Sequence, residues 1–241
     1  MESDADSSTL RERFVTRTPP RFGAVCSATG VALGGAIAGL VSALLMSNVY
    51  GAVASPNSAL DALLSGYLVQ PGMLALAGVY LGWRSDLRAS IRVGVPTREG
   101  VGWILVGPFA YEALTSLGRV AVSAAGLSTG HHAAGLATWE LLAGNPVLIL
   151  PGTVLLFGVM APAEELLYRG VLQAKLRDAF GFVGTVSISA LLFGGMHFLL
   201  SGGVSSLLLT AVGGLSFTIP YERTRNLVVP ILIHGLYWLT L

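Results

Sequence analysis

Seven long apolar stretches, almost free of charge, constrain this chain more than any other feature of its sequence. A helix needs about 20 apolar residues to cross the hydrocarbon core of a bilayer. Only 11% of the 241 residues are charged, whereas about a quarter are charged in soluble domains. We therefore predict an all-α polytopic membrane protein, with about seven transmembrane helices at residues 30–54, 60–83, 101–125, 146–168, 182–200, 204–221 and 226–241.

The positive charges support this number of spans. Of the 14 Lys and Arg residues, all except Arg119 lie in the first 21 residues or in the segments that follow the second, fourth and sixth spans. The positive-inside rule places these segments on the cytosolic side. We expect a multi-pass protein of the cytoplasmic membrane with a cytosolic polar tail (1–21), a cytosolic N-terminus and an external C-terminus. The net charge of +1 argues against nucleic-acid binding.

The fourth span carries a dense group of ionisable residues. Glu165 and Arg169 are four residues apart, so they share a helix face and can form an ion pair. Glu164 points about 100° away around the helix and is left without this cation. A charged group inside a membrane marks a candidate functional site, and an unpaired carboxylate suits a general base. The alternative is an ion pair where the helix leaves the membrane.

Two histidines lie in later spans, His197 in the fifth and His234 in the seventh. A lone histidine in a membrane helix is more often a hydrogen-bond donor between helices than a catalyst. However, Glu164 and His197 are equally distant from the turn expected near Phe180 and Gly181. In an antiparallel hairpin they therefore lie at the same depth, provided that the fourth helix continues to about Asp178. We expect Glu164, His197 and His234 to converge.

This set of residues suits hydrolysis in either of two ways. Two histidines and one glutamate can hold Zn²⁺ with an open position for water. Alternatively, the glutamate and a histidine polarise the water directly, and the second histidine stabilises the oxyanion. The spacing does not separate a zinc enzyme from a metal-free one.

The motifs Glu164-Glu165-x-x-x-Arg169 and Phe193-x-x-x-His197, followed by His234, resemble the CPBP family of CAAX prenyl endopeptidases and bacteriocin-processing or Abi-type proteins. The resemblance covers about residues 146–241, which it implies form a four-helix catalytic core of the CAAX-protease type. Residues 22–145 then hold the first three helices and their loops.

The resemblance implies an intramembrane endopeptidase that acts on peptides or on prenylated or otherwise lipidated proteins within membrane lipid. It assigns water activation to Glu164, assisted by His197. His234 would stabilise the oxyanion or bind a metal, while Glu165 and Arg169 would maintain the shape of the site. It leaves open whether the cofactor is zinc or absent.

One position departs from the family pattern. The third motif usually reads His-x-x-x-Asn, but Trp238 follows His234 here. The missing amide would normally donate to the oxyanion, a contribution of about 10²–10³ in rate. This departure favours an alternative function, a non-catalytic peptide-binding or immunity scaffold. A proton-coupled transporter is a further alternative, because buried Glu, His and Arg also form proton relays.

Two other groups are less promising. Glu112 and Arg119 lie on one face of the third span, where a structural ion pair is the simpler interpretation. His131 and His132 lie in the loop before the fourth span, with Glu140 nearby. We expect an ordinary hydrated loop there rather than a metal site.

Overall fold

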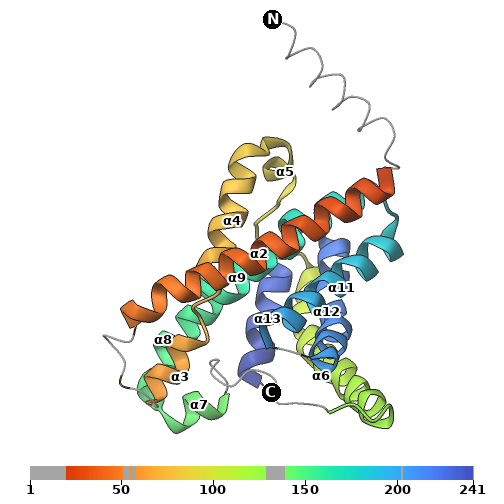
Figure 1. Cartoon of the computed structure of the whole chain (residues 1–241). Helices are drawn as coiled ribbons and strands as arrows, with labels where there is room; N and C mark the ends of the chain where they lie inside the picture. Colours follow the sequence, from red (N-terminus) through yellow and green to blue (C-terminus); the bar gives the residue numbers. More distant parts are fainter. Residues whose placement is uncertain (1–19, 51–54, 56–57, 129–138, 202, 241) are drawn as a thin grey trace, which may run out of the picture.

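The computed structural model describes residues 20–50, 55, 58–128, 139–201 and 203–240. Within these ranges the chain is helical and forms no named strand (Figure 1). Almost all of the predicted polar tail lies outside the described residues, as do His131 and His132. The prediction of an all-α polytopic membrane protein is confirmed.

The first half of the chain contributes two long helices and several shorter ones. They are α2 (Pro20–Tyr50), α3 (Ala59–Ser65), α4 (Gln70–Trp83), α5 (Ser85–Ser90), α6 (Arg98–Ala124) and α7 (Trp139–Gly144).

The second half begins with one continuous rod from Pro146 to Arg177, which changes its helical type along its length. Three helices follow the rod and pack beside it (Figure 1). The elements are η1 (Pro146–Leu148), α8 (Ile149–Leu155), η2 (Leu156–Met160), α9 (Ala161–Glu165), η3 (Leu166–Gln173), α10 (Ala174–Arg177), α11 (Phe182–Ser201), α12 (Val204–Thr224) and α13 (Val228–Thr240).

Five helical segments in the described part of the chain are long and apolar enough to cross a membrane. The other two expected spans correspond to α6 and α13. Helix α6 has 27 residues but includes Glu112 and Arg119, and it is not among the five. The apolar part of α13 is shorter than a full span. The five segments are Arg21–Val49, Ala59–Trp83, Pro146–Arg177, Phe182–Leu200 and Val204–Thr224.

The structure differs from the predicted spans in two places. The first helix begins at Pro20, well before residue 30. The second span keeps its predicted limits but consists of two helices, because α3 ends at Ser65 and a new helix begins at Gln70. Pro71 favours this start, since a proline lacks the N–H that the first turn of a helix leaves unpaired. The fourth helix continues beyond residue 168 to Arg177, which is the extension that the depth argument required.

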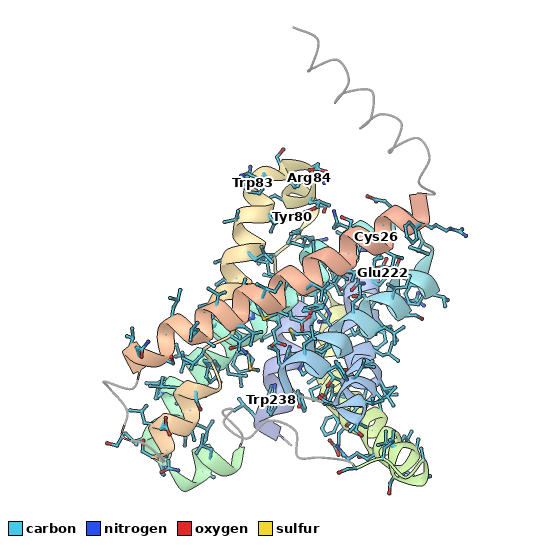
Figure 2. All side chains as sticks on the ribbon, in the orientation of Figure 1. Cys26, Tyr80, Trp83, Arg84, Glu222 and Trp238 are labelled. Atoms are coloured by element: carbon cyan, nitrogen blue, oxygen red, sulfur yellow. The ribbon has the colours of Figure 1, made fainter. Side chains whose placement is uncertain are left out.

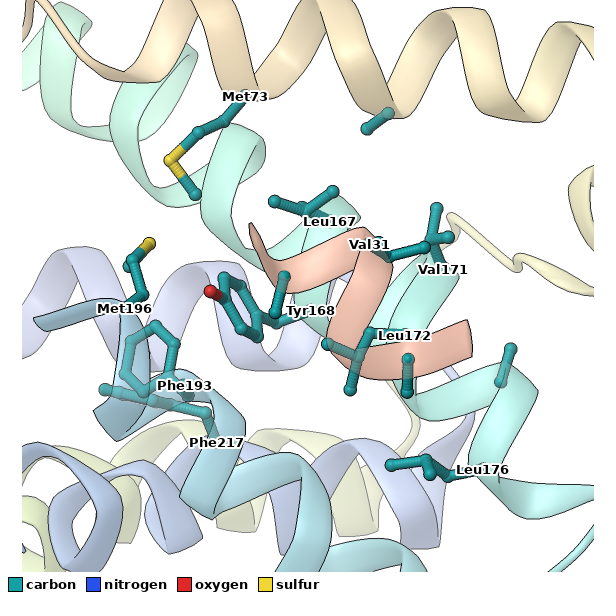
Figure 3. Packing of buried hydrophobic residues seen from close by; sticks show 14 of the residues in the cluster. Val31, Met73, Leu167, Tyr168, Val171, Leu172, Leu176, Phe193, Met196 and Phe217 are labelled. Atoms are coloured by element: carbon teal, nitrogen blue, oxygen red, sulfur yellow. The ribbon is translucent and has the colours of Figure 1, made fainter. Parts of the chain in front are cut away.

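Close helix crossings depend on small residues. At Gly194 of α11, an added Cβ would lie 2.3 Å from the carbonyl oxygen of Leu207 in α12. At Gly72 of α4, it would lie 2.0 Å from the carbonyl oxygen of Ala38 in α2. Because glycine has no side chain, membrane helices can approach this closely. Figure 3 shows the core that results, in which Tyr168 of the rod lies near Phe193.

Candidate active site

The backbone of the rod is unusual on both sides of the adjacent glutamates. Glu164 and Glu165 end the short helix α9, which lies between the π-helical segments η2 and η3. Pro162 has no N–H to donate to an earlier turn, so the regular ladder of hydrogen bonds is interrupted there. π-Helical turns are rare and concentrate at functional sites. Because adjacent residues of a helix point about 100° apart, the two carboxylates face different neighbours.

Glu165 is the centre of a fully buried polar network. The Nε atom of Arg169 lies 3.1 Å from its Oε2, and both side chains have no exposed surface. The Nδ1 atom of His234 lies 2.8 Å from Oε1 of the same carboxylate. Arg169 also donates to the carbonyl oxygen of Gly214 and to the Thr218 hydroxyl, at 3.3 and 3.4 Å. The network thus joins the rod, α12 and α13.

The bond to Glu165 determines which nitrogen of His234 carries the proton. A carboxylate accepts but does not donate, so Nδ1 is the donor and Nε2 is the free position of the neutral ring. The ring of Phe217 stacks on His234, with centroids 4.7 Å apart and planes inclined by 13°. The Arg169 guanidinium lies over Phe193, 4.5 Å from its centroid. These contacts hold the histidine in one orientation.

Glu164 faces the free nitrogen of His234. Its Oε2 lies 4.0 Å from Nε2 of the histidine. Its Oε1 accepts a hydrogen bond of 3.3 Å from the side-chain amide of Gln70 in α4. Glu164 is 7% exposed and Gln70 is 6% exposed, so this contact is buried. The carboxylate therefore has an amide on one side and an imidazole on the other.

Gln70 was not among the residues singled out from the sequence. It lies outside residues 146–241, and its partner is 94 positions away in the chain. One signal could have found it, because a glutamine followed by proline interrupts an otherwise apolar stretch. Polar residues within membrane segments are rare and usually functional.

His197 lies one aromatic ring away from these groups. Its Nδ1 lies 3.0 Å from the carbonyl oxygen of Phe193, one turn earlier in α11. The Phe193 ring has its centroid 4.9 Å from His197 and 6.4 Å from His234. The structure thus brings Glu164 and His234 together directly, whereas His197 is linked to His234 through Phe193.

The side chains do not form a metal site in this arrangement. No group of three or more His, Cys, Asp or Glu residues able to hold an ion occurs among the described residues. His234 uses Nδ1 for Glu165, which leaves one nitrogen of this residue and Glu164 facing each other. A catalytic zinc site needs three protein ligands. We therefore derive no step through a metal.

Trp238 lies one turn beyond His234 on α13. It packs against an apolar cluster that includes Leu156 and Met160 of the rod. Its Nε1 atom is buried and has no hydrogen-bond partner among the described residues. A buried N–H without a partner costs about 1–3 kcal/mol, so an acceptor that reached it would be favoured.

Glu112 and Arg119 do not belong to this site. They form an ion pair on α6, and their side chains are 37% and 45% exposed. This agrees with the structural interpretation of the two residues.

The comparisons with known proteins point to the same part of the chain. Residues 146–240 match the family model described as type II CAAX prenyl endopeptidase Rce1-like. This match supports a similarity to the CAAX protease family for this part of the chain. No curated protein and no solved structure matches the chain. The matched residues include Glu164, Glu165, Arg169, His197 and His234, whereas Gln70 comes from the helices that precede them.

Proposed function

We propose that the protein is an intramembrane endopeptidase that hydrolyses peptide bonds of membrane-associated or lipid-modified peptides without a metal. One observation carries the proposal: His234 is held through Nδ1 by Glu165, and its Nε2 faces the Glu164 carboxylate at 4.0 Å. A single water can reach both groups across this distance. Similarity to the CAAX protease family supports a protease in general terms.

In the proposed reaction, the water donates one hydrogen to Glu164 Oε2 and the other to His234 Nε2. Glu164 takes its proton as the water oxygen attacks the peptide carbonyl carbon. The carbon–nitrogen bond then breaks, and Glu164 returns the proton to the leaving amine. Glu165 and Arg169 do not touch the substrate in this scheme; they position His234. Gln70 positions Glu164 by occupying Oε1, so Oε2 remains for the water.

His197 and Trp238 complete the proposed set. We assign to His197, whose Nδ1 lies 3.0 Å from the Phe193 carbonyl oxygen, the role of assisting proton movement. The unpartnered indole N–H of Trp238 is the donor we assign to the oxyanion, in the position where the family has asparagine. A donor of this kind accounts for about 10²–10³ in rate.

The test is cleavage in detergent of peptides with and without a C-terminal lipid. We expect Glu164→Gln to lower the rate about 10²–10⁴-fold, because it removes the general base and keeps the shape. Glu112→Gln is the matched control and should retain activity, since Glu112 lies outside the site. The thermal midpoint of each variant shows whether it is folded.

Trp238 supplies the second arm of this experiment. Trp238→Phe keeps an aromatic ring but removes the N–H, so we expect a loss of about 10²–10³ that Trp238→Asn partly restores. Equal activity of Glu164→Gln and wild type would overturn the mechanism.

The same departure at Trp238 supports one other candidate, a peptide-binding scaffold that does not cut. It would be favoured by a folded wild type that binds the lipidated peptide but cleaves neither this peptide nor the unlipidated one, even after Trp238→Asn.

A further inference from the structure

A cavity of about 350 Å³ lies between α2, the C-terminal part of α4 and the rod. Its walls are nearly all apolar or small: Gly30, Val31 and Gly34 of α2, Leu76 and Tyr80 of α4, and Leu167 of the rod. Both α2 and α4 belong to segments that can cross a membrane. A groove between two such helices opens toward lipid rather than water.

A cation lies at the Tyr80 end of this groove. The ammonium of Lys175 donates to the Tyr80 hydroxyl at 2.6 Å and lies 5.1 Å from the centre of its ring. Lys175 is the single lysine of the chain. Tyr80 is near the end of α4, and Lys175 is near the end of the rod, so both lie toward the membrane surface. Figure 2 shows Tyr80 at the same end of the molecule as Cys26 of α2.

The charge of Lys175 is not balanced within the described part of the chain. No carboxylate oxygen there lies within 4.0 Å of its Nζ, and Tyr80 supplies only a neutral hydroxyl. The neighbouring cation behaves differently, because Arg177 lies 2.8 Å from the carboxylate of Glu222. Asp86, on the helix after α4, is bound by Arg84 at 2.7 Å. A partly buried ammonium without a carboxylate favours an external anion.

We propose that this groove binds an anionic membrane lipid, with its phosphate on Lys175 and one acyl chain along Gly30 and Gly34. The apolar walls suit the chain, and the cavity volume is at the lower end of the range for small-ligand pockets. The ammonium and the Tyr80 hydroxyl together suit a phosphate, for which lysine acts as a point charge. This lipid site is independent of the proposed protease reaction.

The test measures lipid retention by native mass spectrometry of the purified full chain. Phosphatidylglycerol and phosphatidylcholine with identical acyl chains are the probes. We expect the wild type to retain phosphatidylglycerol about fivefold better, and Lys175→Gln to lose that preference. Gly30→Leu should abolish retention of both lipids, because its side chain enters the groove while its Cβ meets no described atom within 4 Å.

Gly78→Leu is the matched control for the groove. Gly78 also has no described atom within 4 Å of an added Cβ, but it does not line the cavity. It should retain phosphatidylglycerol as the wild type does. Equal retention of the two lipids by the wild type, or unchanged retention by Gly30→Leu, would overturn the proposal.

The single lysine allows a second measurement. An amine-reactive reagent modifies Lys175 and the N-terminal amine, and peptide mapping separates the two. We expect phosphatidylglycerol to slow modification of Lys175 at least severalfold and to leave the N-terminal amine unaffected. Phosphatidylcholine has the same phosphate but balances its charge with choline, so equal protection by this lipid would contradict a preference for anionic lipid at Lys175.

Discussion

Glu165 and Glu222 are both bound by arginine, but the exposure of their partners differs. Glu165, in the middle of the rod, is bound by Arg169 and His234, and none of the three exceeds 4% exposure. Glu222, near the end of α12, is bound by Arg177 and Arg225, whose side chains are 21% and 45% exposed. Water shares in balancing the charge of the second network. In the first network, protein atoms alone must balance the charge, so the positions of the partner groups are closely constrained.

The central region also differs in what it leaves unbalanced. Glu164 adjoins Glu165 in the sequence but has no arginine or lysine within 4.0 Å among the described residues, only His234 and the Gln70 amide. At the end of α12, Arg177 and Arg225 both donate to Glu222, and Gln173 donates to it as well. The comparison shows that Glu164, which has no cation beside it in the described part of the chain, adjoins Glu165, whose charge is neutralised by Arg169. The outer network only joins helices.

The largest effect is expected from Arg169→Met. It leaves Glu165 buried without its cation, which should lower the free energy of unfolding by about 3–5 kcal/mol. The measurement is unfolding in mixed micelles with increasing SDS.

The double variant Arg169→Met, Glu165→Leu is the control. Because it removes both charges, it should recover much of the stability that the single variant loses. A single variant as stable as the wild type would show that the central network is not held together by this pair.

A smaller effect is expected from Gln70→Leu. It leaves Glu164 Oε1 without a donor in a buried setting, at a cost of about 1–3 kcal/mol in the free energy of unfolding. Activity should fall as well, because Glu164 is free to turn away from the water. Gln70→Glu, which offers an oxygen in place of the amide, should not restore it.

Gln173→Leu is the matched comparison for Gln70, since it removes another buried glutamine. Glu222 would keep its two arginines, so we expect a smaller loss of stability and little change in peptide cleavage. Equal effects of the two glutamine variants on the rate of cleavage would mean that Gln70 has only a structural role.

The smallest effect is expected from Arg225→Met. The side chain is 45% exposed and Glu222 retains Arg177, so the loss should stay below about 1 kcal/mol and shrink further in high salt. A loss as large as that of Arg169→Met would remove the distinction between the two networks. The same mixed-micelle titration measures both variants.

Much of the architecture could be predicted because membrane insertion leaves a local signal. Long apolar stretches located the helices, and the turn expected near Phe180 and Gly181 separates the rod from α11. The i, i+4 spacing of Glu165 and Arg169 predicted their pair, which the structure shows. The break before Gln70 was missed, since hydropathy averages over a short interruption.

The details of the site depended on contacts that no local pattern records. The sequence placed Glu164 and His197 at one depth, but depth alone does not say which side chains meet. Packing of α13 against the rod brings His234 to both glutamates, while the ring of Phe193 lies near both histidines. Gln70 of α4 could not be predicted as the partner of Glu164 for the same reason.

The sequence by itself determined that this chain is helical and membrane-bound, and that its polar residues gather in the fourth span and its neighbours. The reason is energetic: each buried charge opposes insertion, so its position in an apolar stretch is informative. Only the tertiary structure decided that Glu165 binds both Arg169 and His234. Glu164 instead accepts a hydrogen bond from Gln70 and faces His234. These contacts depend on the packing of helices that are far apart in the chain, where small residues allow a close approach.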